Sequence, residues 1–173
     1  ILLVLSNIAY SQRNCTTDEY NKNLLENNIE FNQIQQELEI FTSNYINMLP
    51  LMNTSTDVIV IPVVVHILYN DSLENISDEQ IQSQLDSLNK DFRAQNADIS
   101  SVPSVFEPLV ADIGLEFCLA TQDPDGNIST GVNRVFTENT SFSYNDNSMK
   151  FTSQGGVDIW DSERYLNIWV CNI

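Results

Sequence analysis

The sequence predicts an α/β (α+β) domain with a twisted mixed sheet and a backing helix, preceded by a helical segment. Three observations predict this fold class: a helical apolar pattern over residues 16–49, a β-branched apolar run at Val58–Tyr69, and a capped helix after Ser77 that three shorter strand-like runs follow. A strand, a helix and another strand joined over this length favour a right-handed crossover unit.

The first segment has the periodicity of an amphipathic helix. Thr16 and Glu19 fit a capping box at its start, and Pro50 ends it before a polar linker at residues 51–57. One apolar stripe recurs at spacings of three and four residues: Phe31, Ile34, Leu38, Phe41, Tyr45 and Met48. A single amphipathic helix must dock on another surface, and the rest of this chain can supply one.

The run at Val58–Tyr69 is almost entirely apolar, as expected for a strand covered on both faces. Pro62 cannot donate to a strand ladder, so we expect it near the strand's start, at an edge or at a bulge. The next helix begins with Ser77 as its cap and Gln80 closing a capping box, and should fade near residues 93–96. Its buried stripe is predicted to be Ile81, Leu85, Leu88 and Phe92.

Residues 113–121, 131–137 and 165–171 read as three further strands. Asp123-Pro124-Asp125-Gly126-Asn127 between the first two is strong turn chemistry, so we expect those strands to form a hairpin. The two carboxylates of this turn also allow a calcium loop. The downstream glutamate of an EF-hand is absent, which favours a plain turn.

The charge balance is strongly acidic, with 24 Asp and Glu against 7 Lys and Arg and a net charge of −17. This argues against a nucleic-acid partner, which needs a basic face, and against adsorption to anionic lipid. No apolar run approaches the roughly 20 residues of a membrane helix. An acidic exported protein fits these properties.

The chain begins in a short apolar run, Ile1–Leu5, followed by Ala9-Tyr10-Ser11. This resembles the end of a secretory signal peptide cleaved before Gln12, and the alternative is a short buried strand or helix. Export places the three cysteines in an oxidising compartment, where an odd number leaves one thiol unpaired within this chain. Because the end at Ile173 interrupts a strand-like run, we expect a fragment of a longer protein.

The candidate chemical residues are few. His66 is the only histidine and lies in the most apolar run, so a buried, hydrogen-bonded role is expected rather than a catalytic one. No helix carries two histidines one turn apart, so no zinc-protease site is complete. Cys118 and Cys171 lie in predicted strands and form a disulfide if those strands are neighbours, or otherwise two separate thiols. Cys15 is either an incidental exposed cysteine or a thiolate able to bind zinc.

Four sequence blocks in order resemble the amino-terminal subdomain of the pappalysin/cytophagalysin family, secreted zinc metalloproteases of the metzincin group. The match runs over nearly all of residues 61–172. The first block is IPVVVHILY from Ile61, and the second is ISDEQI from Ile76 with LNKDFR from Leu88 and NAD from Asn96. The third is IGLEFCLA from Ile113, which continues into DPDGN and TGV. The fourth consists of KF at Lys150, GG at Gly155, Trp160 and YLNIWVCN from Tyr165.

The resemblance implies residues 1–11 as a signal-peptide remnant, 12–57 as a helical propeptide that docks on its own catalytic domain, and 58–173 as a truncated upper catalytic subdomain. It implies a zinc endopeptidase acting on polypeptide substrates, with calcium as a further possible ion. The family's HExxHxxGxxH motif, whose histidines hold zinc and whose glutamate is the general base, is not in these residues. The fragment itself is therefore expected to be inactive.

Arg13-Asn14-Cys15-Thr16-Thr17 resembles the family's propeptide Arg-x-Cys-Gly-Thr motif, with Thr16 where glycine is usual. This gives Cys15 a hypothetical role as a cysteine-switch ligand of the catalytic zinc. Two other functions stay open. One is a secreted, non-enzymatic binding module that uses its acidic face or residues 138–154, and the other is an inactive relative of the protease.

Overall fold

The structure is a computed structural model that describes residues 16–48 and 57–173. The predicted signal segment, Cys15 and most of the predicted linker lie outside the described residues. The chain divides into two compact units, Ile1–Asn53 and Thr54–Ile173, and each is described separately below. No helix among the described residues is both long and apolar enough to cross a membrane.

The first unit contains two helices, α1 (Thr17–Asn27) and α2 (Ile29–Met48), where the sequence predicted one. The break is at Asn28, whose backbone is extended (φ −125°, ψ 103°) and whose amide still donates to the Leu24 carbonyl. Its Oδ1 atom accepts from the Phe31 amide at 2.9 Å, so this one residue ends α1 and caps α2. The predicted capping box is also wrong, because the Thr16 side chain makes no cap hydrogen bond.

The apolar stripe of α2 is exposed within this unit. Ile34 and Leu38 are each 53% exposed, Phe41 is 66% exposed, and neither helix has a buried residue. Phe41 and Tyr45, one turn apart, stack on each other with ring centroids 6.2 Å apart. The described contacts of the helical unit therefore leave its predicted docking face available for a partner surface.

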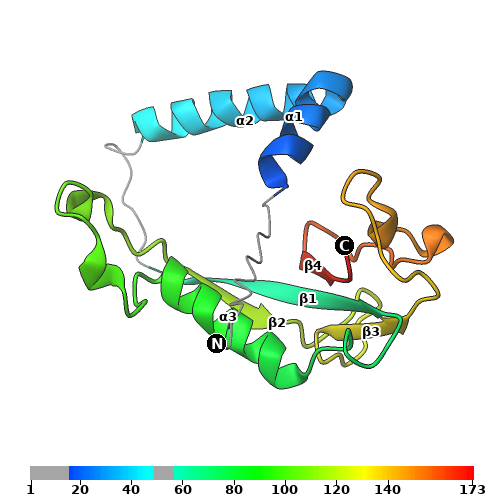
Figure 1. Cartoon of the computed structure of the whole chain (residues 1–173). Coiled ribbons are helices and arrows are strands. Elements are labelled where there is room, and N and C mark those ends of the chain that lie inside the picture. The colour runs from blue at the N-terminus through cyan, green and yellow to red at the C-terminus, as the bar shows by residue number, and fades with distance from the viewer. Residues whose placement is uncertain (1–15, 49–56) are drawn as a thin grey trace, which may run out of the picture. The chain divides into compact units, whose positions relative to one another are not determined.

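The second unit is built around the long strand β1 (Ile59–Tyr69), which pairs in parallel with β2 (Leu115–Leu119), β3 (Val132–Phe136) and β4 (Leu166–Val170). β2 pairs with the first half of β1 and β3 with the second half. Both strands pair with the same edge of β1. The Val63 carbonyl accepts from the Ala120 amide and the Val65 amide donates to the Gly131 carbonyl, and alternate residues of a strand direct their backbone groups to the same edge. β4 takes the opposite edge over Val63–Ile67, so β1 is central (Figure 1).

The predicted hairpin between β2 and β3 is wrong. The two strands run in the same direction, one after the other along β1, and the only antiparallel pairing among the described residues is an isolated bridge between Gln122 and Ile128. The Asp123–Asn127 turn is present, with the Gly126 amide donating to the Asp123 carbonyl. It therefore closes a small loop between two collinear strands rather than a hairpin.

Pro62 lies inside the central strand, where a missing amide would normally cost a ladder bond. Odd-numbered residues of β1 direct their backbone groups to β2 and β3, so Pro62 faces the β4 edge. β4 begins to pair only at Val63. The amide that Pro62 lacks has no strand partner there, which explains how β1 accommodates proline.

Helix α3 (Asp78–Phe92) covers one face of the sheet (Figure 1). Its predicted start is confirmed: Ser77 accepts from the Gln80 amide, and the Gln80 side chain accepts from the Ser77 amide. Ile81 and Leu85 are 4% and 3% exposed. They pack on the β1 side chains of one face, together with the β2 residue Phe117, and form the main core.

Asn89 of α3 stabilises the outer edge of β2. Its Nδ2 donates to the Phe117 carbonyl at 2.9 Å and its Oδ1 accepts from the Phe117 amide at 2.7 Å. The carboxamide thus takes the place of a neighbouring strand on an edge that would otherwise stay unpaired. Arg93, the residue after α3, adds ion pairs to Asp112 and Glu116.

The other face of the sheet carries no α-helix among the described elements and is covered by residues 138–165. Leu68 packs there with Phe142, Met149 and Val157. Val64 packs with Ala120, Tyr165 and Trp160. Four short 3₁₀ helices complete the unit: η2 (Ile99–Ser101), η3 (Glu107–Leu109), η4 (Ser148–Lys150) and η5 (Thr152–Gln154).

Candidate functional site

His66 lies at the centre of the sheet and has no exposed surface. Its Nε2 atom is 2.9 Å from Asn167 Oδ1 and its Nδ1 atom is 3.4 Å from Asn133 Nδ2. Burial lowers the pKa of His66 below its ordinary value, and the hydrogen bond to Asn167 opposes this only in part. The prediction of a buried, hydrogen-bonded histidine is confirmed, and the ring is neutral and closed to solvent at neutral pH.

The described residues do not form a metal site. No group of three or more His, Cys, Asp or Glu side chains in residues 16–48 and 57–173 is arranged to hold a metal ion. The only histidine uses both ring nitrogens inside the sheet. A zinc ion held by three histidines therefore does not fit the residues present, and we derive no zinc-dependent step from them.

The Asp123 turn also does not fit calcium. Asp123 Oδ1 accepts from the Asp125 and Asn127 amides at 3.0 and 2.8 Å, and Asp123 Oδ2 accepts from the Asn127 side chain at 3.1 Å. These hydrogen bonds, the Asn127 side chain foremost, lower the pKa of Asp123. Both carboxylate oxygens are directed at N–H donors, which supports the plain-turn interpretation.

Cys118 and Cys171 are both free thiols. Cys118 of β2 lies opposite Pro62, whereas Val170 lies opposite Ile67 on the other edge of β1. This register separates the two cysteines by about 20 Å along the strands, at about 3.3 Å per residue, and a disulfide needs Cα atoms within about 7 Å. They are therefore separate thiols and not a bridged pair.

The two thiols differ in environment. Cys118 is exposed, while Cys171 is partly covered. Burial, with a smaller contribution from the carboxylate of Glu74, raises the pKa of Cys171. Because the thiolate is the reactive form, Cys171 is the less reactive of the two toward modifying reagents.

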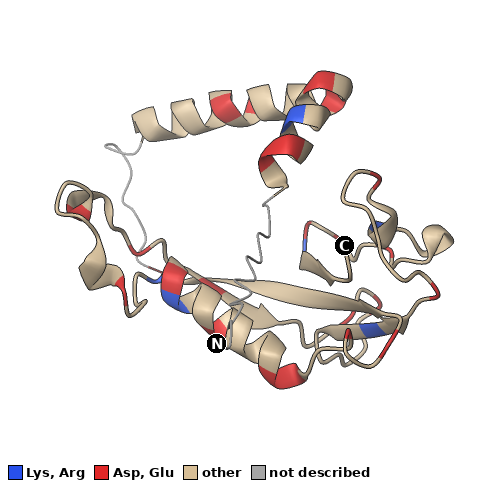
Figure 2. Ribbon diagram, in the orientation of Figure 1, with Lys and Arg blue, Asp and Glu red and all other residues tan. Residues whose placement is uncertain are grey.

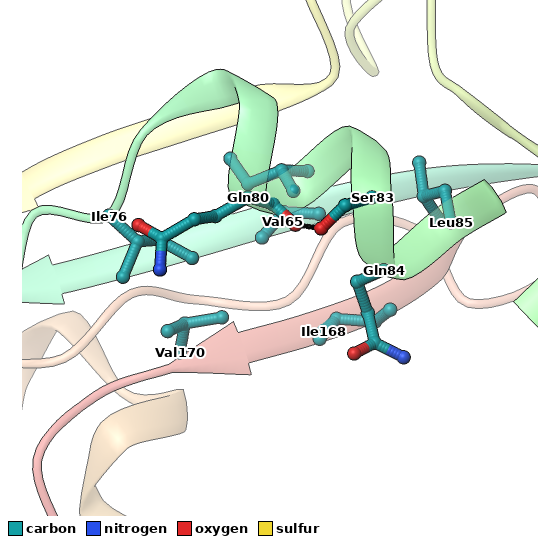
Figure 3. Close-up of a pocket in the computed structure, with 9 residues that line it drawn as sticks. Val65, Ile76, Gln80, Ser83, Gln84, Leu85, Ile168 and Val170 are labelled. Atoms are coloured by element: carbon teal, nitrogen blue, oxygen red, sulfur yellow. Dashed lines mark hydrogen bonds between the residues drawn. The ribbon is translucent and has the colours of Figure 1, made fainter. Parts of the chain in front are cut away.

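A groove of about 370 Å³ runs between α3 and β4 (Figure 3). Val65, Ile168 and Val170 of the sheet contribute apolar side chains to it, and Gln80 and Gln84 of α3 contribute carboxamides. The groove exists because α3 lies over β1 and β2 and leaves the β4 side of this face less covered, with Ile168 and Val170 only partly buried. None of its lining residues is charged, so it suits an uncharged, apolar occupant.

Acidic residues occur more often than basic residues along the described chain of both units, as the colouring of the ribbon in Figure 2 shows. The Arg134 guanidinium donates hydrogen bonds to Asn75, to the Ile76 carbonyl and to Asp78 beside the start of α3. Arg93 is engaged by Asp112 and Glu116, and the Arg93 guanidinium lowers the pKa of Asp112. Both guanidinium groups therefore stabilise the second unit from within, through carboxylates and other oxygen acceptors of their own chain.

The chain matches no protein-family model and no curated protein. Three solved structures are similar to it. A mirolysin complex with a compound is 49% identical, with a TM-score of 0.65, over 67% of this chain and 43% of that one. Mature mirolysin of Tannerella forsythia with a cleaved peptide is 47% identical, with a TM-score of 0.64, over 68% and 43%. A promirolysin mutant from the same organism is 38% identical, with a TM-score of 0.68, over 87% and 47%.

The chain therefore spans less than half the length of these three mirolysin structures. Identity of this level over two thirds or more of the present chain shows a common fold. The predicted fold class is confirmed: the second unit is a metzincin-like α/β arrangement with a parallel-dominated sheet and a backing helix, α3.

Sequence reasoning missed the three asparagines that organise this unit. Asn89 pairs with the β2 edge, while Asn133 and Asn167 contact the two nitrogens of His66. A weak signal was available for Asn167, which interrupts the apolar run Tyr165–Cys171 with an amide. A polar residue inside a strand with apolar neighbours needs buried partners, but the sequence does not identify them.

Proposed function

We propose that this chain is the front part of an exported zinc-dependent endopeptidase of the pappalysin type, made as a zymogen. The observation that carries the proposal is the 38–49% identity to mirolysin and promirolysin over 67–87% of the chain. A protein that has a pro form and a mature form, and holds a cleaved peptide in the mature form, has the properties of a peptidase activated by removal of a propeptide.

The extents of the matches support a propeptide in the first unit. Residues 54–173 make up about 69% of the chain. This is close to the 67–68% of the chain that the matches to the mirolysin–compound complex and to mature mirolysin cover. The promirolysin match covers 87% of the chain, which is more than the second unit contains, so this match includes part of the first unit. We therefore assign residues 12–57 as the propeptide and 58–173 as the upper catalytic subdomain.

The exposed stripe of α2 is the part of the propeptide that would dock on the catalytic domain. Its side chains include Ile34, Leu38 and Phe41, all more than half exposed in the helical unit. Burying such side chains yields roughly 1.5–3 kcal/mol each relative to leaving them in water. Docking of this stripe would therefore favour association of the propeptide with its own domain until the linker is cut.

Zinc, in this proposal, is held by residues outside these 173, because the described residues form no ligand cluster. When bound, the metal would activate water for peptide hydrolysis. The described residues supply the scaffold: β1 as the central strand, α3 as the backing helix, and the two hydrogen bonds by which Asn89 pairs with the β2 edge.

The test uses the complete protein encoded with these residues and the 173-residue chain side by side. We expect the complete, activated protein to cleave an unstructured polypeptide, to lose this activity with a chelator, and to regain it with Zn²⁺. The 173-residue chain alone should show no cleavage. Chelator-insensitive cleavage by the complete protein, or zinc-dependent cleavage by the isolated chain, would contradict the proposal.

The latency of the zymogen tests the role of Cys15, which lies outside the described residues. If its thiolate is the fourth zinc ligand of the pro form, Cys15→Ala in the complete protein raises activity before propeptide removal. Cys118→Ala is the matched control, because it removes an exposed thiol elsewhere. Equal latency of both variants would remove Cys15 from the proposal while leaving the peptidase assignment intact.

A further inference from the structure

The chain's only histidine and both of its tryptophans meet at one place in the structure. The His66 ring stacks on Trp169 with centroids 5.1 Å apart and an interplanar angle of 30°. Trp160 meets it edge-on at 6.1 Å and 79°. Three separate stretches of the second unit therefore converge on one imidazole: β1, β4, and the Trp160 loop, which we define as residues 157–165.

Asn167 connects these stretches through every hydrogen-bonding position of its side chain. Oδ1 faces His66 Nε2 at 2.9 Å and accepts from the Trp160 amide at 2.9 Å. Nδ2 donates to the Trp160 carbonyl at 3.0 Å and to the Tyr165 carbonyl at 3.2 Å. The side chain thus holds the Trp160 loop by three bonds and β1 by the fourth, with no capacity to spare.

This arrangement fixes the tautomer of the neutral His66 ring. The carboxamide nitrogen of Asn167 is used by two carbonyls, so its oxygen faces the imidazole and Nε2 must carry the proton. Nδ1 is then an acceptor, and it faces the Asn133 Nδ2 donor at 3.4 Å. A second proton on Nδ1 would point at that donor, inside a site with no exposed surface.

The two hydrogen-bond partners of the imidazole, Asn167 and Asn133, are both uncharged amides. The Lys150 ammonium lies 5.8 Å from the centroid of the Trp169 ring, which stacks on His66, and would repel a second cation. The β4 strand contains no charged residue. Among the charged or titratable residues of the other neighbouring elements, Arg134 of β3 pairs with Asp78. In the Trp160 loop, the Asp158 and Asp161 carboxylates accept from backbone amides, Arg164 lies over the Tyr165 ring, and the Tyr165 hydroxyl donates to the Asp123 carbonyl. Glu163 of the same loop is exposed.

We propose that His66 is an acid-sensitive latch, which holds β4 and the Trp160 loop on β1 while its ring is neutral and loosens them when the ring is protonated. The sign follows from linkage. Burial keeps the folded-state pKa below the unfolded value of about 6.5, so the unfolded chain binds the extra proton first. Stability from this group is complete above about pH 6.5 and is lost as the pH falls toward the folded-state pKa.

The test measures urea unfolding of the whole chain between pH 7.5 and 5.0, followed by tryptophan fluorescence. Both tryptophans border the latch, so the signal reports this site. We expect the wild-type folding constant to fall by up to about tenfold per pH unit below 6.5. His66→Gln, which cannot titrate, should lack this loss. Equal pH dependence in the two proteins would overturn the proposal.

A second variant keeps the test decisive if His66→Gln does not fold. Asn133→Asp puts a carboxylate beside Nδ1, where the second proton arrives, and should remove most of the acid loss by pairing with the imidazolium. In the wild-type chain the single imidazole NMR signal should titrate below pH 6.5. Titration at or above pH 6.5 in the folded chain, or an unchanged acid loss in Asn133→Asp, would refute the latch.

Discussion

Replacing Asn89 by Ala tests how the edge of the parallel sheet is stabilised. The change removes both hydrogen bonds between the carboxamide and the Phe117 backbone, of 2.9 and 2.7 Å. Phe117 is only 7% exposed, so water replaces these partners poorly. Each lost bond costs about 1 kcal/mol, and a buried backbone group left without a partner costs about 1–3 kcal/mol. Alanine's better helix propensity returns about 0.5 kcal/mol.

The net expectation is a loss of about 2–3 kcal/mol in the free energy of unfolding. Urea denaturation of the 173-residue chain measures it, and hydrogen exchange at the Phe117 amide should accelerate in the same variant because that amide loses its acceptor. Lys90→Ala is the matched control, one residue along α3 on an exposed position. If Asn89→Ala unfolds at the same urea concentration as Lys90→Ala, the carboxamide does not stabilise the β2 edge and the reasoning fails.

Three other predictions follow from local geometry. Gly131→Ala should destabilise the chain by more than about 2 kcal/mol, because its φ is +71° and an added Cβ would lie 2.6 Å from the Ala120 backbone at the end of β2. Gly126→Ala, at φ +86° with open space around it, should cost about 1 kcal/mol. A larger loss for Gly126→Ala than for Gly131→Ala in urea denaturation would contradict this. A thiol reagent should label Cys118 faster than Cys171 in the native chain, because Cys171 is partly covered and its thiol has a raised pKa. Equal labelling rates would show that Cys171 is not protected. Leu85→Ala, at a core position 3% exposed, should lower the free energy of unfolding by about 2–5 kcal/mol, and a loss below 1 kcal/mol in calorimetry would mean that α3 does not anchor the core.

Features set by short-range chemistry were predictable from the residues. Ser77 and Gln80 form the expected capping box because both partners lie within one helical turn. Asp123–Asn127 forms the expected turn because its hydrogen bonds run within five residues. The apolar run around His66 predicted a buried strand and a buried ring, because a strand whose residues are almost all apolar packs inside the core together with its one imidazole.

Helix boundaries in the first unit show where such local reasoning stops. Residues 16–49 contain no proline or glycine before Pro50, so the sequence marks no break at Asn28 and predicts one helix. The Asn28 side chain instead accepts the Phe31 amide and starts a second helix. Asparagine can satisfy either a helix interior or a cap, and the choice depends on the geometry of both flanking turns.

The sequence by itself therefore determined the order, type and approximate bounds of the elements in the second unit, and the nature of its one histidine. Only the tertiary structure decided which strands are partners, because a turn between two strands does not specify whether they pair with each other or with a third. β1 is long enough to pair with β2 and then β3 along one edge. The roles of Asn89 and Asn167 were likewise decided by distant partners, since an amide's buried contacts depend on what folding brings beside it.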